Sequence, residues 1–173
     1  MGASITFRPL VRSDLPRLER WLAEPHVETW WRERLDPSGL EKKFGPRIDG
    51  TEPTYVFVIE SGIRPIGWIQ WYRWSDYPSH AAQLGAEPGS AGIDLALGEK
   101  TLLGSGLGPQ VINEFIRRVV WSDPAIRAVV ADPEAANLRS VRAFEKAGFV
   151  LVRTVQLGSE NFQRCVVRLG RTE

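Results

Sequence analysis

Two features of this sequence could do chemistry: a glycine-rich turn and a few isolated acidic residues. The turn consists of Leu103, Gly104, Ser105, Gly106, Leu107 and Gly108. Glycines let a backbone approach a ligand closely, and the unpaired N–H groups at a helix start attract anions. The turn therefore predicts a phosphate-binding site between a strand and a helix. Asp94 and Asp132 each come at or near the end of an apolar run, where a carboxylate can accept a proton.

The turn does not fit either of the two common nucleotide motifs. No Lys-Ser or Lys-Thr pair follows the glycines, so it is not a Walker A loop. Its Gly-x-Gly-x-Gly spacing and its late position in the chain differ from a dinucleotide fingerprint.

Composition limits the partners and the kinds of site. The chain has 173 residues, the length of one domain, and 22 basic against 21 acidic residues give a net charge of +1. This balance argues against binding to nucleic acid by phosphate neutralisation. Cys165 is the only cysteine and there are two histidines, so an internal disulfide is excluded and no metal site is expected. The sequence shows no signal-peptide pattern and no apolar run long enough to span a membrane, so we expect a cytoplasmic protein.

The elements that must position these residues follow from hydrophobic spacing. Strands are predicted at residues 4–8, 55–60, 66–73, 91–97, 128–131, 150–155 and 163–169. Helices are predicted at residues 15–22, 40–44, 111–120 and 138–147, with Pro25 ending the first and a loop at 75–90. This order predicts an α/β (α+β) domain over residues 1–173, with one mixed, mostly antiparallel sheet of about seven strands and about four flanking helices.

About thirty residues after the glycine turn, the segment from Asp132 to Phe149 carries Asn137 and ends in Gly148-Phe149. The two segments together resemble the pyrophosphate motif and the second acetyl-CoA element of the GNAT family, the Gcn5-related N-acetyltransferases. The resemblance covers essentially the whole chain and implies acetyl-CoA as co-substrate. The residues it places at the cofactor are Leu95, Leu97, Leu103, Gly104, Ser105, Gly106, Leu107, Gly108, Asn137, Arg139 and Phe144.

The resemblance gives these residues separate roles. The three glycines would wrap the pyrophosphate, and a backbone N–H near Leu95 or Leu97 would polarise the thioester carbonyl. Asn137 would bond the pantetheine arm or a nearby backbone group. Two positions depart from the family pattern: Leu103 replaces the usual Arg or Gln, and Phe144 replaces a tyrosine proposed to protonate the departing thiolate.

Several dispersed segments resemble aminoglycoside 6'-N-acetyltransferases more specifically. They are His26 to Trp31, Pro65 to Tyr72, Gly92 to Asp94, and Ala131 to Pro133. The resemblance implies acetyl transfer to an aminoglycoside amine, chiefly the 6'-amine, by direct transfer in a ternary complex. It also implies that this transfer confers antibiotic resistance.

The chemistry of such a substrate agrees with the residue types. A rigid polycation bearing sugar hydroxyls needs carboxylates and flat aromatic walls. Five of the seven tryptophans fall between Trp30 and Trp74. We expect Asp94 to act as the base, with Asp132 as the second candidate for this role. We expect both residues to bind substrate. The other expected substrate-binding residues are Trp30, Trp31, Glu52, Gln70 and Tyr72.

Other functions stay open at this point. One is a siderophore-type lysine N-acyltransferase, although its His–Asp pattern is absent beside Asp94. Others are acylation of another small amine and binding of acyl-CoA without turnover. His26 and His80 are expected to be structural or surface residues, and the protein a monomer or homodimer.

Overall fold

The computed structural model describes residues 2–173, which fold into seven strands and six helices. The strands are β1 (Ile5–Pro9), β2 (Thr54–Ser61), β3 (Arg64–Arg73), β4 (Ser90–Leu97), β5 (Ala128–Ala131), β6 (Val150–Val155) and β7 (Arg164–Gly170). The helices are α1 (Leu15–Leu22), α2 (Pro25–Trp31), α3 (Pro37–Ile48), α4 (Pro78–Leu84), α5 (Leu107–Arg118) and α6 (Leu138–Lys146).

The strands form one mixed sheet in the order β1-β2-β3-β4-β5-β7-β6. Strands β4 and β5 are parallel, whereas β1–β2, β5–β7 and β6–β7 are antiparallel. This confirms the predicted α/β class with seven strands.

The prediction of about four helices was too low, because prolines start helices here as well as end them. Pro25 follows the end of α1 but also opens α2, and Pro78 opens α4 within the segment predicted to be a loop. Proline suits the first turn of a helix, where its missing N–H has no partner to lose. Helix α3 also runs from Pro37 to Ile48, well beyond the predicted residues 40–44.

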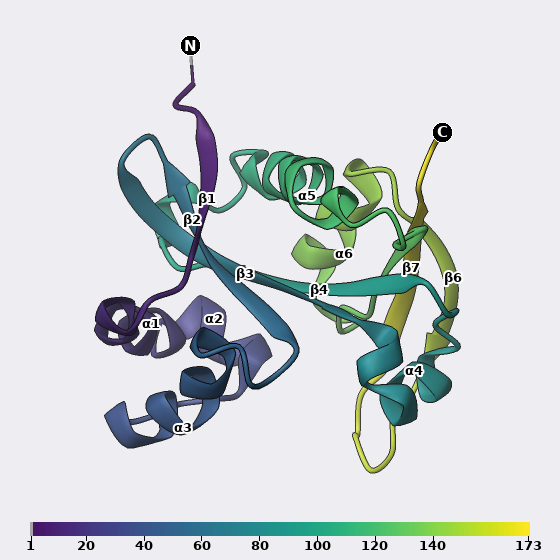
Figure 1. Ribbon diagram of the computed structural model, residues 1–173, viewed down its shortest axis with the longest axis horizontal. Coiled ribbons are helices and arrows are strands. Elements are labelled where there is room, and N and C mark those ends of the chain that lie inside the picture. Colours follow the sequence, from purple (N-terminus) through teal and green to yellow (C-terminus); the bar gives the residue numbers. More distant parts are fainter. Residues whose placement is uncertain (1) are drawn as a thin grey trace. The chain divides into compact units, whose positions relative to one another are not determined.

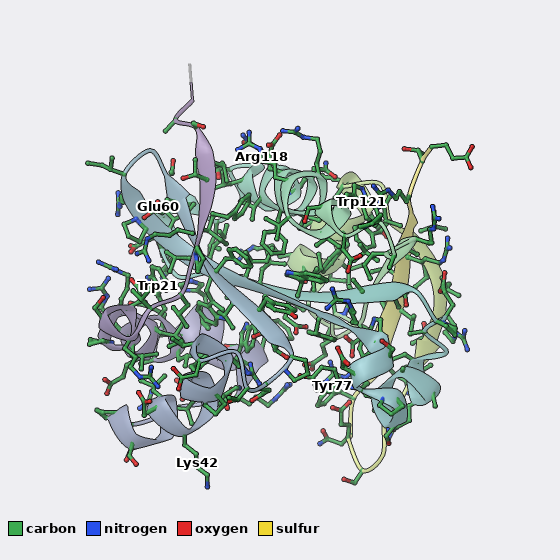
Figure 2. All side chains as sticks on the ribbon, in the orientation of Figure 1. Trp21, Lys42, Glu60, Tyr77, Arg118 and Trp121 are labelled. Carbon is green, nitrogen blue, oxygen red and sulfur yellow. The ribbon has the colours of Figure 1, made fainter. Side chains whose placement is uncertain are left out.

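The chain divides into two compact units, and β3 and β4 each contribute residues to both. The first unit comprises residues up to Trp71 together with Asp94–Leu103, and its core is built on Trp68, which is fully buried. The Trp21 ring stacks on Trp68 at 6.1 Å between centroids, and Trp31 packs against it at 5.2 Å. Figure 2 shows that Lys42, by contrast, points outward from α3.

The second unit comprises Tyr72–Ile93 and Gly104–Glu173. Helix α4 packs on one face of its strands through a cluster of buried side chains. The cluster contains Tyr72, Trp74, Ala81, Leu84, Val130, Leu157 and Val166. Neighbouring residues on a strand point to opposite faces, so Val129 and Val167 face the other side, where α5 and α6 lie (Figure 1).

Strand β6 lies at one edge of the sheet and contains an irregularity. Leu151 pairs with Val167 and Arg153 with Val166, so Val152 is an extra residue on β6. Val150, Leu151 and Val152 are all exposed, although they are apolar. This arrangement has the residue count of a β-bulge, which bends and twists a strand.

Asp14 in the first unit accepts two hydrogen bonds from the Arg8 guanidinium, at 2.7 and 2.8 Å, and one from the Val11 N–H. Burial raises the pKa of Asp14, but these hydrogen bonds outweigh it and hold the pKa below its usual value. A carboxyl with a lowered pKa in the folded state stabilises the protein above its unfolded pKa, about 4, and this contribution is lost as the pH falls through the folded value.

We therefore expect Asp14→Asn to lower the free energy of unfolding by about 1–2 kcal/mol at pH 7. The difference from the wild type should shrink as the pH falls below about 4, because Asp14 then becomes protonated in the wild type too. Urea denaturation at pH 7, 5 and 3 measures this, and an equal difference at all three values would contradict the ion-pair explanation.

Candidate active site

The glycine turn leads directly into α5 and has the backbone that the sequence predicted. Gly104 and Gly106 have φ values of 74° and 79°, a left-handed conformation that glycine adopts without strain. Gly106 is the N-cap of α5 and has no side chain to occupy the first N–H groups of the helix. Because these groups carry the positive end of the helix dipole, the turn can hold an anion such as a phosphate.

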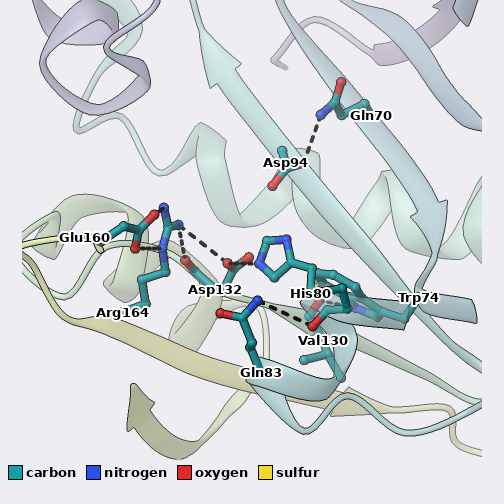
Figure 3. Close-up of polar contacts among 10 residues, drawn as sticks. Gln70, Trp74, His80, Gln83, Asp94, Val130, Asp132, Glu160 and Arg164 are labelled. Atoms are coloured by element: carbon teal, nitrogen blue, oxygen red, sulfur yellow. Dashed lines mark hydrogen bonds and ion pairs between the residues drawn. The ribbon is translucent and has the colours of Figure 1, made fainter. Parts of the chain in front are cut away.

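Asp94 lies in the part of β4 that belongs to the first unit, and a hydrogen-bond chain holds its carboxylate. The Nε2 of Gln70 on β3 donates to Asp94 Oδ2 at 2.9 Å (Figure 3). The Nη1 of Arg47 on α3 donates to Gln70 Oε1 at 3.0 Å, and its Nε donates to Glu52 Oε1 at 2.9 Å. Of the predicted substrate-binding residues, Gln70 therefore contacts Asp94 directly, and Glu52 is linked to Gln70 through Arg47.

The C-terminal end of β4 is held by side chains from α1 and α2. The Nε2 of His26 lies 2.8 Å from the carbonyl oxygen of Leu97, and a neutral His26 must carry its proton on Nε2 to donate there. The Trp21 ring lies so close to Gly98 that a Cβ there would be 2.1 Å from the ring. These contacts fix the strand segment that contains Leu95 and Leu97, both half-buried.

Asp132 follows β5 in the second unit and is buried between the side chains of His80 and Arg164. Its Oδ2 lies 3.3 Å from His80 Nε2 and 3.5 Å from Arg164 Nη1, and Figure 3 shows the carboxylate between these side chains. Arg164 also binds Glu160, at 2.7 and 2.8 Å. The hydrogen bonds to Glu160 raise the pKa of Arg164 above its ordinary value despite burial, so Arg164 stays charged.

A pocket of about 550 Å³ opens beside this cluster within the second unit. Residues of α4 and of the β6–β7 connection form its walls. They are Tyr77, Pro78, Ser79, His80, Gln83, Leu157, Gly158, Ser159 and Glu160. His80 and Glu160 thus belong both to the pocket and to the charged cluster around Asp132.

The predicted aromatic residues fall into different surroundings. Trp30 is half-buried near the end of α2, whereas Trp31 packs against the core of the first unit. Tyr72 is buried in the second unit, edge-on to Trp74 and Tyr77, and a Cβ on Gly92 would meet its ring at 2.3 Å. The structure therefore surrounds Trp31 and Tyr72 with core residues.

The remaining predicted cofactor residues lie on α6. Asn137 is its N-cap and accepts a hydrogen bond from the Ser140 N–H at 3.2 Å. Arg139 is exposed. Phe144 is buried edge-on against Phe149, with ring centroids 5.0 Å apart. A phenylalanine supplies no proton at this position.

Arg47, Arg164 and the pairing of His80 with Asp132 are not evident from the sequence. Arg47 lies beyond the predicted end of its helix, and His80 lies in the segment predicted to be a loop.

Residues 2–173 contain no helix long and apolar enough to cross a membrane. Over the same residues, no cluster of three His, Cys, Asp or Glu side chains has the arrangement of a metal site.

The chain is similar to known acyltransferases in sequence and in structure. The chain is 29% identical over 155 residues to the aminoglycoside N(6')-acetyltransferase type 1 of Klebsiella pneumoniae, covering 88% of this chain and 77% of the relative. It is 23% identical over 135 residues to the lysine N-acyltransferase MbtK of Mycolicibacterium paratuberculosis, covering 78% of this chain and 60% of the relative.

Among solved structures, the chain is similar to the aminoglycoside acetyltransferase AAC(6')-Ib in complex with coenzyme A and kanamycin. The TM-score is 0.86 at 27% identity, with 97% of this chain and 95% of the other covered. The family model for the acetyltransferase (GNAT) domain matches residues 11–157. This match spans most of the chain and includes the glycine turn, Asp94 and Asp132, so the chain belongs to the GNAT acetyltransferase family.

Proposed function

We propose that residues 1–173 form an acetyltransferase domain that transfers acetyl from acetyl-CoA to an amine of an aminoglycoside, chiefly the 6'-amine. The observation that carries this proposal is the match along 97% of the chain to an acetyltransferase solved with coenzyme A and kanamycin. The chain's own residues supply an anion-binding turn before α5 and a held carboxylate, Asp94, on β4. We further propose that the enzyme acts in the cytoplasm and confers resistance.

In this mechanism, Asp94 takes a proton from the bound ammonium, directly or through one water. The freed amine attacks the thioester carbon, and a backbone N–H near Leu95 or Leu97 stabilises the oxyanion. The carbon–sulfur bond then breaks, coenzyme A leaves as a thiolate, and the nitrogen loses its second proton to water or to the thiolate to give the neutral amide. Because a thiol pKa is about 8.5, the thiolate can leave without an acid at Phe144 and take a proton from water.

The contacts refine the proposed roles of the other residues. Asp132 lies between His80 and Arg164, so we assign it a role in substrate binding in preference to a role in proton transfer. Arg47 partly neutralises Glu52, which leaves Glu52 a weaker ligand for a cation. We propose that Trp30 contacts substrate and that Trp31 and Tyr72 support the site by packing.

The test is acetyl transfer by the purified protein with kanamycin or tobramycin as acceptor. Thiol release measures turnover, and mass spectrometry with fragmentation locates the acetyl group. A resistance panel in a sensitive host shows whether the activity protects cells. Turnover with lysine as acceptor but with no aminoglycoside would instead favour the activity named for the MbtK relative. Coenzyme A binding without turnover on any amine would favour a binding protein.

A substitution in the glycine turn tests the cofactor site. Gly106→Ala places a side chain on a residue with φ 79°, where no other atom lies within 4 Å, so the folding cost is backbone strain of about 1–2 kcal/mol. We expect the KM for acetyl-CoA to rise about tenfold or more, because losing about 1.4 kcal/mol of binding is a tenfold change.

The matched control is Gly50→Ala, which has φ 76° and equally open surroundings. It should lower the melting temperature by a similar amount and leave the KM for acetyl-CoA unchanged. Equal KM values for the two variants would show that the glycine turn does not bind the cofactor.

A further inference from the structure

We propose that Arg47 is a positioning residue for acetyl transfer and that it acts through Gln70 on Asp94. This inference rests on the proposed function, because it takes Asp94 as the proton acceptor. The observation behind it is the unbroken chain of hydrogen bonds from Glu52 through Arg47 and Gln70 to Asp94.

Arg47 is itself firmly held. Only 15% of its side chain is exposed, and its Nε donates to Glu52 Oε1 at 2.9 Å. Its guanidinium carbon lies 5.5 Å from the centre of the Phe44 ring, one turn earlier on α3. A planar guanidinium fixed by an ion pair and an aromatic ring presents its remaining N–H groups in set directions.

This fixed donor determines how the Gln70 amide is oriented. A guanidinium has five donors and no acceptor, so Gln70 must turn its oxygen toward Arg47. The amide nitrogen then faces Asp94 and donates to its Oδ2 at 2.9 Å. Gln70 is only 8% exposed, so little water reaches it to compensate for a wrong orientation.

Without Arg47, the amide could rotate and present its oxygen to the Asp94 carboxylate. Two acceptors would then face each other, and the carboxylate would turn away or take up a proton. An N–H donor favours the ionised form, which is the form that can accept a proton from the substrate. Arg47 thus keeps Asp94 oriented and ionised without touching it.

Two other roles for Arg47 must be distinguished from this one. It could merely neutralise Glu52, in which case its removal would strengthen binding of a cationic acceptor and leave kcat unchanged. It could merely stabilise α3, in which case activity would fall only as far as folding does. A comparison of kcat, KM, pH profile and stability separates the three roles.

The experiment compares Arg47→Met, Arg47→Lys and a matched control, Lys43→Met. Lys43 lies on the same helix, pairs with Glu33, and has its Nζ 5.6 Å from the centre of the same Phe44 ring. We expect Arg47→Met to lower kcat about ten- to a hundredfold, with the KM for acetyl-CoA unchanged. The acid limb of its kcat profile should move to higher pH, because Asp94 without a fixed donor is easier to protonate.

Arg47→Lys retains a cationic donor and should recover most of kcat, whereas Lys43→Met should match the wild type in kcat and pH profile. A second readout needs no turnover: the side-chain amide signals of Gln70 in a ¹⁵N–¹H NMR spectrum. They should follow the titration of a neighbouring carboxylate in the wild type and lose that dependence in Arg47→Met.

The outcomes separate this inference from the proposed function. Wild-type kcat and pH profile in Arg47→Met, or Gln70 signals that do not change, would overturn the inference. A loss of kcat no larger than that of Lys43→Met would also overturn it. A wild-type protein without turnover on any aminoglycoside would overturn the proposed function, while the Gln70 signals would still test the positioning by Arg47.

Discussion

Asp94→Asn is expected to lower kcat about 10²- to 10⁴-fold at neutral pH, because asparagine cannot accept the proton that the substrate ammonium must lose. Asparagine has nearly the same size, and its oxygen can still accept the hydrogen bond from Gln70 Nε2. The fold should therefore survive, and the KM for acetyl-CoA should stay close to the wild-type value. Single-turnover measurements with saturating aminoglycoside give the rate of the chemical step directly.

The control for this prediction is Asp36→Asn. Asp36 caps α3 by accepting a hydrogen bond from the Gly39 N–H at 2.7 Å, and asparagine is an equally good cap. This variant also removes one carboxylate but should keep wild-type kcat. Activity of Asp94→Asn within a few-fold of the wild type would remove Asp94 as the base.

Gly67→Ala is expected to destabilise the first unit strongly. A Cβ on Gly67 would lie 2.1 Å from the carbonyl oxygen of Ala96 and 3.0 Å from the Cα of Leu97. Both are backbone atoms of β4, so relief requires the strand itself to move. We expect a loss of about 3 kcal/mol, which is typical of severe overpacking and lowers the melting temperature by about 10 °C in a protein of this size.

The control is Gly62→Ala in the turn between β2 and β3. Gly62 has φ 63°, but the nearest atom to its added Cβ is 3.9 Å away, so only strain of about 1–2 kcal/mol is expected. Differential scanning calorimetry of both variants measures the difference. Equal melting temperatures would show that β4 yields to the extra methyl group.

The sheet was predictable because its strands carry a local pattern. Residues of β2 and β3 combine apolar side chains with a Ser-Gly hairpin signal, and β5 is a short apolar run. Helices α2 and α4 have a weak local signal, because each has only seven residues and begins with proline, a residue that is also common at helix ends and in loops. In short helices, packing against the sheet outweighs the weak local signal.

The site was predictable only in part, for a related reason. Asp94 stands out because a charge is unusual within an apolar strand, and the glycine turn stands out by its spacing. The partners of these residues come from distant parts of the chain. Arg47 is 23 residues from Gln70, and His80 is 52 residues from Asp132. Local sequence periodicity carries no information about contacts between residues so far apart in the chain.

The extra residue in β6 bears on how well this protein resists aggregation. An edge strand offers unpaired backbone groups to other chains, and exposed apolar side chains such as Val150 and Leu151 add to the risk. The extra residue Val152 interrupts the regular pairing of β6 with β7, and such irregularities bend and twist an edge strand. We therefore expect it to disfavour edge-to-edge association with other chains at a strand whose side chains would otherwise favour it.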